Sequence, residues 1–263
     1  MALTFLSLIT TIVFLENFRT WERAVKKVNY RNKEIITAGG VVFVIILILM
    51  NVYSAFYWDD TDFLEYTMLS AACIGFSGLL DDIYGTNAVK GLKGHFSELL
   101  RGKITTGNVK AIMGLSIACF LSMKKNEFWP EIFIDTLIIA LSTNLLNLMD
   151  LRPGRACRFF LFSIALMFLY FLHEGLTNLI YYFMPLVASV LVFLFYDSRE
   201  LLMMGDVGSN VLGICLGMMI SWGSSFYVKI GVLSFLIGIH LVAEFYSISE
   251  ILERIISFRK KTL

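Results

Sequence analysis

Nine separate apolar runs, each at or near the length of a membrane span, constrain this fold more than any other feature. They lie at residues 2–16, 36–58, 63–80, 109–123, 129–149, 158–172, 178–196, 209–224 and 226–245. A transmembrane helix needs about 20 mostly apolar residues, and in lipid its backbone polar groups must be satisfied within the helix. The sequence therefore predicts an all-α, polytopic integral membrane protein of about nine transmembrane helices.

The composition also indicates that lipid is the main solvent of this chain. Hydrophobic residues make up 57% of the 263 residues and the mean hydropathy is +0.74, more apolar surface than one soluble core of this length can bury. The formal net charge is only +1, whereas nucleic-acid-binding domains carry a basic excess on one face. We therefore expect membrane lipids, and no nucleic acid, among the partners.

The distribution of basic residues predicts the orientation. If the nine runs cross in alternation, 19 of the 22 Lys and Arg residues fall on one side, and only Lys124, Lys125 and Lys229 on the other. Cytoplasmic loops carry the positive excess, and no basic residue precedes the first run, so we expect a retained first span with the N-terminus outside. We interpret 1–245 as the transmembrane part of one domain and 246–263 as its cytoplasmic amphipathic helix.

Acidic residues gather at the predicted cytoplasmic ends of three runs. Asp81 and Asp82 end the third run, Asp150 ends the fifth, and Asp206 opens the eighth. Carboxylates close to a membrane are costly unless they are paired, hydrated or holding a cation. Hard oxygen ligands of this kind suit Mg²⁺ or Mn²⁺. A divalent-cation site is therefore one interpretation, and solvated loop carboxylates are the other.

Two further polar patterns fall on the same predicted face. Asn144, Asn147 and Asp150 recur every three residues and form a polar stripe on an apolar helix. The segment GDVGS (205–209) places small residues at a helix N-terminus, where backbone N–H groups can bind a phosphate. The alternatives are interhelical hydrogen bonding by the stripe and a simple N-cap at Asp206. Together the patterns favour a phosphate-bearing substrate handled at the cytoplasmic surface.

Five stretches, spread through most of the chain, carry a family resemblance. They are NYRNKEIITAGG (29–40), GLLDDIYG (78–85), KGLKGHFSELLRGKITTG (90–107), NLLNLMD (144–150) and GDVGSNVLG (205–213). In this order the chain resembles the polyprenyl-phosphate N-acetylhexosamine-1-phosphate transferases (glycosyltransferase family 4), the superfamily of phospho-MurNAc-pentapeptide translocase and the GlcNAc-1-phosphate transferases. The resemblance implies transfer of a sugar 1-phosphate from a UDP-sugar, in the first place a UDP-N-acetylhexosamine, to undecaprenyl or another polyprenyl phosphate. Mg²⁺ (or Mn²⁺) would be the cofactor and UMP the second product.

The resemblance also implies roles for the matching residues. Asp81, Asp82 and Asp150 would be catalytic, and Asp206 together with Asp82 would hold the metal. The remaining matches would contact the substrates, and they are Lys93, Asn144, Asn147, Gly205, Gly208 and Ser209. The resemblance implies a bacterial plasma membrane and allows a homodimer, while the distribution of basic residues predicts that the active face is cytoplasmic.

Two stretches depart from the family pattern. Asp150 is followed by LRPGR (151–155) in place of a DGLDG-like stretch, and GIHLVAEFYSISE (238–250) stands where relatives carry a histidine-rich loop. Arg152 and Arg155 can supply compensating phosphate contacts, with positive-inside anchoring as the alternative. Two rival functions stay open: a catalytically inactive family member that acts as a lipid-phosphate-binding scaffold or regulator in envelope assembly, and a secondary transporter.

Overall fold

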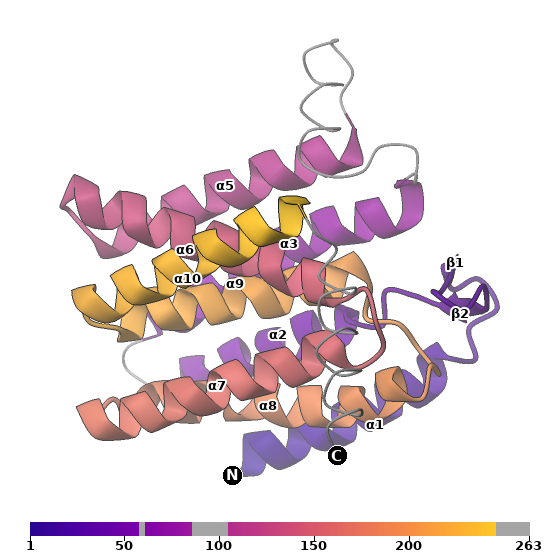
Figure 1. Ribbon diagram of the computed structural model, residues 1–263. Helices are drawn as coiled ribbons and strands as arrows, with labels where there is room; N and C mark the ends of the chain where they lie inside the picture. Colours follow the sequence, from indigo (N-terminus) through magenta and orange to yellow (C-terminus); the bar gives the residue numbers. More distant parts are fainter. Residues whose placement is uncertain (58–60, 86–104, 246–263) are drawn as a thin grey trace, which may run out of the picture.

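The computed structural model describes residues 1–57, 61–85 and 105–245, which form nine α-helices and one β-hairpin (Figure 1). The helices are α1 (Ala2–Phe18), α2 (Val41–Tyr57), α3 (Asp62–Tyr84), α5 (Thr106–Lys125), α6 (Trp129–Met149), α7 (Arg155–Glu174), α8 (Thr177–Ser198), α9 (Gly205–Gly223) and α10 (Phe226–Phe245). Six of them, α3, α5, α6, α7, α8 and α10, are long and apolar enough to cross a membrane. The predicted class, a helical membrane protein, is confirmed. Lys93 and the predicted amphipathic tail lie outside the described residues.

The bundle is organised around α9, which is buried along almost its whole length between α3 and α6. Two glycines allow this close packing. A Cβ at Gly213 would lie 2.4 Å from the Cα of Thr143, and one at Gly217 would lie 2.7 Å from the Cα of Ile139. Small residues four positions apart let two helix backbones touch. This antiparallel register brings the start of α9 beside the end of α6.

A β-hairpin that the sequence did not predict connects α1 and α2. Its strands β1 (Lys26–Val28) and β2 (Glu34–Ile36) pair antiparallel. The turn is closed by the side chain of Asn29, whose Oδ1 accepts hydrogen bonds of 2.9 Å from the backbone N–H groups of Arg31 and Lys33. Asparagine favours such turns because its side chain imitates a backbone acceptor.

The hairpin corrects one predicted span. The sequence placed an apolar run near 36–58 with approximate limits, whereas the helix α2 spans Val41–Tyr57. The backbone of Ile36 is instead used in β2, and its carbonyl accepts a bond of 2.8 Å from the N–H of Met203. Hydrophobicity alone cannot separate a short strand from the start of the helix that follows it.

Successive helices run in opposite directions, so the helix ends gather at two opposite ends of the bundle (Figure 1). The end that carries the hairpin, here called the hairpin end, contains the C-termini of α1, α3, α6 and α8 and the N-termini of α2, α5, α7 and α9. Asp81, Asp82, Asp150 and Asp206 therefore all lie at this end, as the sequence predicted for the four acidic residues.

Candidate functional site

A cavity of about 430 Å³ opens at the hairpin end. Its size is within the usual range of about 300–1,000 Å³ for pockets that bind small molecules. Its walls are formed by the hairpin, the end of α3, the segment after α6, the segment before α9 and the first turn of α9. The lining residues are Lys27, Val28, Asn29, Tyr30, Ile35, Thr37, Asp82, Asp150, Leu151, Arg152, Pro153, Asp197, Glu200, Met203, Gly205 and Asp206. The wall is thus rich in charged groups of both signs.

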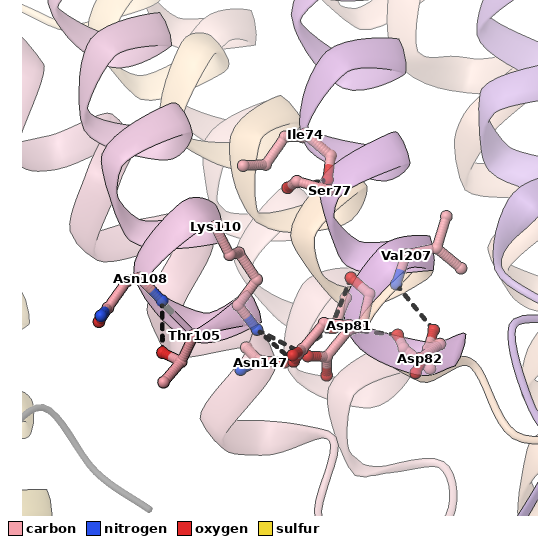
Figure 2. Close-up of polar contacts among 12 residues, drawn as sticks. Ile74, Ser77, Asp81, Asp82, Thr105, Asn108, Lys110, Asn147 and Val207 are labelled. Carbon is pink, nitrogen blue, oxygen red and sulfur yellow. Dashed lines mark hydrogen bonds and ion pairs between the residues drawn. The ribbon is translucent and has the colours of Figure 1, made fainter. Parts of the chain in front are cut away.

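Asp82 ties three separate segments together in this wall. The residue is only 3% exposed. Its Oδ1 is 2.9 Å from the Nζ of Lys27 in the hairpin. Its Oδ2 accepts a 3.3 Å hydrogen bond from the N–H of Val207 in α9 (Figure 2). A carboxylate at a helix N-terminus is favourable because it faces the positive end of the helix dipole. Both oxygens of this predicted metal ligand are therefore already engaged.

Gly205 lies against the same carboxylate. Its φ angle is +73°, a conformation that residues with a side chain rarely adopt, and an added Cβ would lie 2.4 Å from the Oδ2 of Asp82. Glycine is needed here for its backbone conformation and because no side chain fits. The reason given from the sequence, access of a phosphate, stays a prediction.

Gly205→Ala is therefore expected to be damaging. The left-handed conformation costs about 1–2 kcal/mol for a residue with a Cβ, and the clash displaces Asp82 from Val207. We expect a lower unfolding temperature and loss of most ligand binding at the cavity, measured by thermal unfolding and ligand titration in detergent. Gly231→Ala on α10 is the control, because nothing lies within 4 Å of the added Cβ; an equal loss in this control would contradict the explanation.

A second polar group, centred on Lys110 of α5, lies beside the cavity. The Nζ of Lys110 is 2.7 Å from the Oδ2 of Asp206. It is 3.7 Å from the Oδ2 of Asp81, and Figure 2 labels Lys110 and Asp81. The amide of Asn147 completes the group in one orientation, in which its nitrogen donates to the Oδ1 of Asp206 at 2.8 Å and its oxygen accepts from Lys110 at 3.2 Å. Side chains from α3, α5, α6 and α9 thus meet at one ammonium group.

Asp150 lines the cavity directly after α6. Burial raises the pKa of its carboxyl group well above the usual value, and the negative charges of Asp197 and Asp206 raise it further, against the opposing charge of Arg155. Asp197 of α8 is an additional carboxylate in the wall, and its Oδ2 accepts a 2.7 Å bond from the N–H of Gly154. This bond holds the segment after α6 against α8.

The two arginines of the divergent segment have different surroundings. Arg155 donates from Nε to the carbonyl of Met149 at 2.8 Å and from a terminal nitrogen to the carbonyl of Leu148 at 3.3 Å. It therefore binds the free carbonyl groups at the end of α6, a favourable position for a cation. Arg152 lines the cavity with its guanidinium 4.5 Å from the centre of the Tyr30 ring.

The other predicted contact residues lie along α6 and α9. Gly208 touches the segment before α2, since a Cβ here would lie 2.7 Å from the Cα of Gly40. Ser209 is buried and its Oγ is 3.2 Å from the amide of Asn147. Asn144 is half-buried one turn before Asn147 on the same helix face. Among these residues, Asn147 has the direct link to the carboxylates.

Several residues of the cavity, and Lys110 beside it, were not singled out from the sequence. Lys27 and Lys110 counted only as positive charges, and Glu200 was not considered. Glu200 accepts hydrogen bonds from the Asn29 side chain at 3.1 Å and from the Tyr30 hydroxyl at 3.0 Å, which holds the hairpin turn over the cavity. No local pattern reveals these partners, because each contact joins segments that are far apart in the sequence.

The oxygen atoms around the Lys110 ammonium group fit a magnesium site that has few protein ligands. Within the part of the chain that the structure describes, no three His, Cys, Asp or Glu side chains are grouped so that they alone could hold a metal. Asp81 and Asp206 nevertheless converge on one position, with the amide oxygen of Asn147 beside it. Mg²⁺ is usually held by one or two carboxylates together with water and substrate phosphates. These residues match such a site.

The fold and the site together define an integral membrane protein with a charged small-molecule cavity at one end of its helical bundle. A sequence model of the Glycosyl transferase family 4 matches residues 64–224, more than half of the 263 residues. The chain belongs to this family, as the motifs predicted. No curated protein matches the chain. The matched region includes Asp81, Asp82, Asp150 and Asp206. Membership of this family supports, in general terms, a transferase that moves a sugar phosphate to a polyprenyl phosphate.

Proposed function

We propose that this protein transfers a sugar 1-phosphate from a UDP-sugar, of the UDP-N-acetylhexosamine class, to undecaprenyl or another polyprenyl phosphate and releases UMP. One observation carries the proposal: carboxylates and lysines from four helices and the hairpin meet at one end of a membrane bundle. A lipid phosphate and a water-soluble donor can both reach such a place. Family membership supports the same reaction class.

The proposal includes an orientation. All nine described helices would cross the membrane of a bacterial cell, with the N-terminus outside and the hairpin end in the cytoplasm. The distribution of charge supports this, since Lys124, Lys125 and Lys229 lie at the end opposite the hairpin, whereas Lys27 and Lys110 lie at the hairpin end. Cytoplasmic segments are those that carry the positive excess.

In the proposed reaction, an oxygen of the lipid phosphate attacks the β-phosphorus of the donor in line. A new P–O bond forms while the bond from the β-phosphorus to the bridging oxygen breaks, and its electron pair leaves with UMP. Asp81, whose side chain is 21% exposed against 1% for Asp82, would help to orient the acceptor phosphate. Lys27 and Lys110 would stabilise the negative charge of the phosphates.

The same proposal names residues for the metal. Mg²⁺ would be held by Asp206 and Asp81 with the amide oxygen of Asn147, and it would neutralise charge on the pyrophosphate. Asp82 would be a positioning residue. It would hold the hairpin in place through Lys27 and the start of α9 through Val207. The structure-based assignment thus exchanges the metal roles that the sequence suggested for Asp81 and Asp82.

A transporter is the less favoured function. Secondary transporters bind their substrates near the bilayer midplane at interrupted helices. The acidic residues of this cavity lie at or next to helix ends, and α3, α6 and α9 are each continuous where described. The arrangement suits chemistry at the membrane surface better than passage across it.

The test is UMP release by purified protein in nanodiscs with undecaprenyl phosphate, Mg²⁺ and a panel of UDP-sugars. We expect one donor to be turned over, and Asp81→Asn to lower kcat by about 10²-fold or more, as loss of an electrostatic group at the reacting centre does. Asp62→Asn is the matched control, because Asp62 is an exposed residue at the other end of the same helix. Failure of every donor, with polyprenyl phosphate still bound, would instead support the inactive scaffold.

A further inference from the structure

Lys110 occupies a position that its own helix does not explain. The N-terminus of α5 is capped by Thr105, whose hydroxyl accepts a 3.2 Å bond from the N–H of Asn108 (Figure 2). Lys110 follows in the second turn, and the first turn contains no acidic residue. A cation near the positive end of a helix dipole is unfavourable. The negative charges that balance Lys110 therefore come from other helices.

These charges come from two helices at once. The Lys110 side chain is 17% exposed and lies between Asp206 of α9 and Asp81 of α3, whose side chains are 24% and 21% exposed. Both carboxylate groups therefore lie within 3.7 Å of the same ammonium group. Two neighbouring carboxylates repel unless a positive charge lies between them. Lys110 supplies that charge from within the chain.

We propose that Lys110 is a tethered counter-ion that competes with the divalent cation for Asp206 and Asp81. When a cation binds these oxygens, the ammonium group of Lys110 must leave them, because its 2.7 Å contact with Asp206 uses an oxygen that the cation needs. The long, flexible lysine side chain can make this movement without moving α5.

The displaced ammonium group has a second partner in the occupied site. A substrate phosphate at the occupied site would give the displaced ammonium group a favourable partner. Lys110 thereby couples cation binding to phosphate binding. This step rests on the proposed function for the identity of the phosphate, whereas the competition itself depends only on the contacts of Lys110.

The experiment measures cation binding without substrate. Purified full-length protein in detergent is titrated with Mn²⁺, and free Mn²⁺ is followed by electron paramagnetic resonance. We expect Lys110→Met to bind Mn²⁺ at least about tenfold more tightly than wild type, since one positive charge beside the cation is removed. Lys110→Arg keeps the charge and is expected to bind as weakly as wild type.

Lys27→Met separates competition from a general charge effect. Lys27 is also ion-paired with a carboxylate of the site, but with Asp82 and not with Asp206 or Asp81. We expect a clearly smaller gain in Mn²⁺ affinity than for Lys110→Met. If Lys110→Met is not recovered folded, Lys110→Gln replaces it.

Unchanged or weaker Mn²⁺ binding by the neutral Lys110 variants overturns the proposal, and so does an equal gain in Lys27→Met. Turnover of UDP-sugars is measured on the same wild-type preparation. A chain that shows the competition but turns over no donor refutes the transferase and keeps the role of Lys110. A chain that turns over a donor without the competition refutes the role of Lys110 alone.

Discussion

Asp206→Asn is expected to abolish sugar-phosphate transfer, with a fall in kcat of about 10³-fold, as for loss of a main electrostatic group in other active sites. The change keeps the shape of the side chain but removes its negative charge. Asp206 is the shared partner of Lys110, at 2.7 Å, and of Asn147, at 2.8 Å, and it lines the cavity. UMP release gives kcat, and Mn²⁺ titration of the same sample shows whether cation binding is lost in parallel.

The position of Asp206 makes this variant informative. It lies in the first turn of α9 with 24% of its side chain exposed, and Asp81 stays beside Lys110 as a counter-charge, so the neutral amide is expected to lower the unfolding temperature only modestly. Loss of turnover in a protein that still folds would then be due to chemistry. A variant that keeps more than a tenth of the wild-type kcat would show that Asp206 holds neither a metal nor the substrate charge.

The helices could be predicted from the sequence because their apolar runs are long. The run at 129–149 coincides with α6, and the run at 226–245 coincides with α10. The hairpin could not be predicted, because its strands have three residues each and Glu34–Ile36 leads directly into an apolar segment. The bond from Met203 that fixes Ile36 comes from a distant segment.

The same contrast holds within the site. Asp81, Asp82 and Asp206 were predicted to lie together, since helix ends on one membrane face must be near each other and the residues match a family pattern. Their lysine partners were not predicted, because a pair such as Lys27 and Asp82 depends on the folded path of the hairpin. Arg155 shows the converse: its charge suggested phosphate binding, while its described bonds go to the end of α6.

A second charged group lies at the end of the bundle opposite the hairpin. Asp135 of α6 is fully buried, and its Oδ1 is 2.9 Å from the Nζ of Lys229 in α10, a residue that is 3% exposed. Lys125 lies 3.5 Å from the other carboxylate oxygen, to which the side chain of Asn126 donates at 2.8 Å. Only 17% of the apolar window of α10 is buried in the protein, so this ion pair is a main polar attachment of α10 to α6.

Asp135→Asn is therefore expected to destabilise the protein by about 3 kcal/mol, because it leaves Lys229 buried without its counter-charge. Removing both charges, in Asp135→Asn with Lys229→Met, is expected to restore part of that loss, since the deeply buried Lys229 is no longer left unpaired, while Lys125, which stays, has a side chain that is 20% exposed. Thermal unfolding in detergent measures both changes, with Asp62→Asn as the exposed control. Because the cavity is at the other end, kcat per folded molecule should stay at the wild-type value. A double variant that is less stable than Asp135→Asn would mean that Lys229 stabilises the bundle independently of Asp135, and the ion pair would no longer explain how α10 is held.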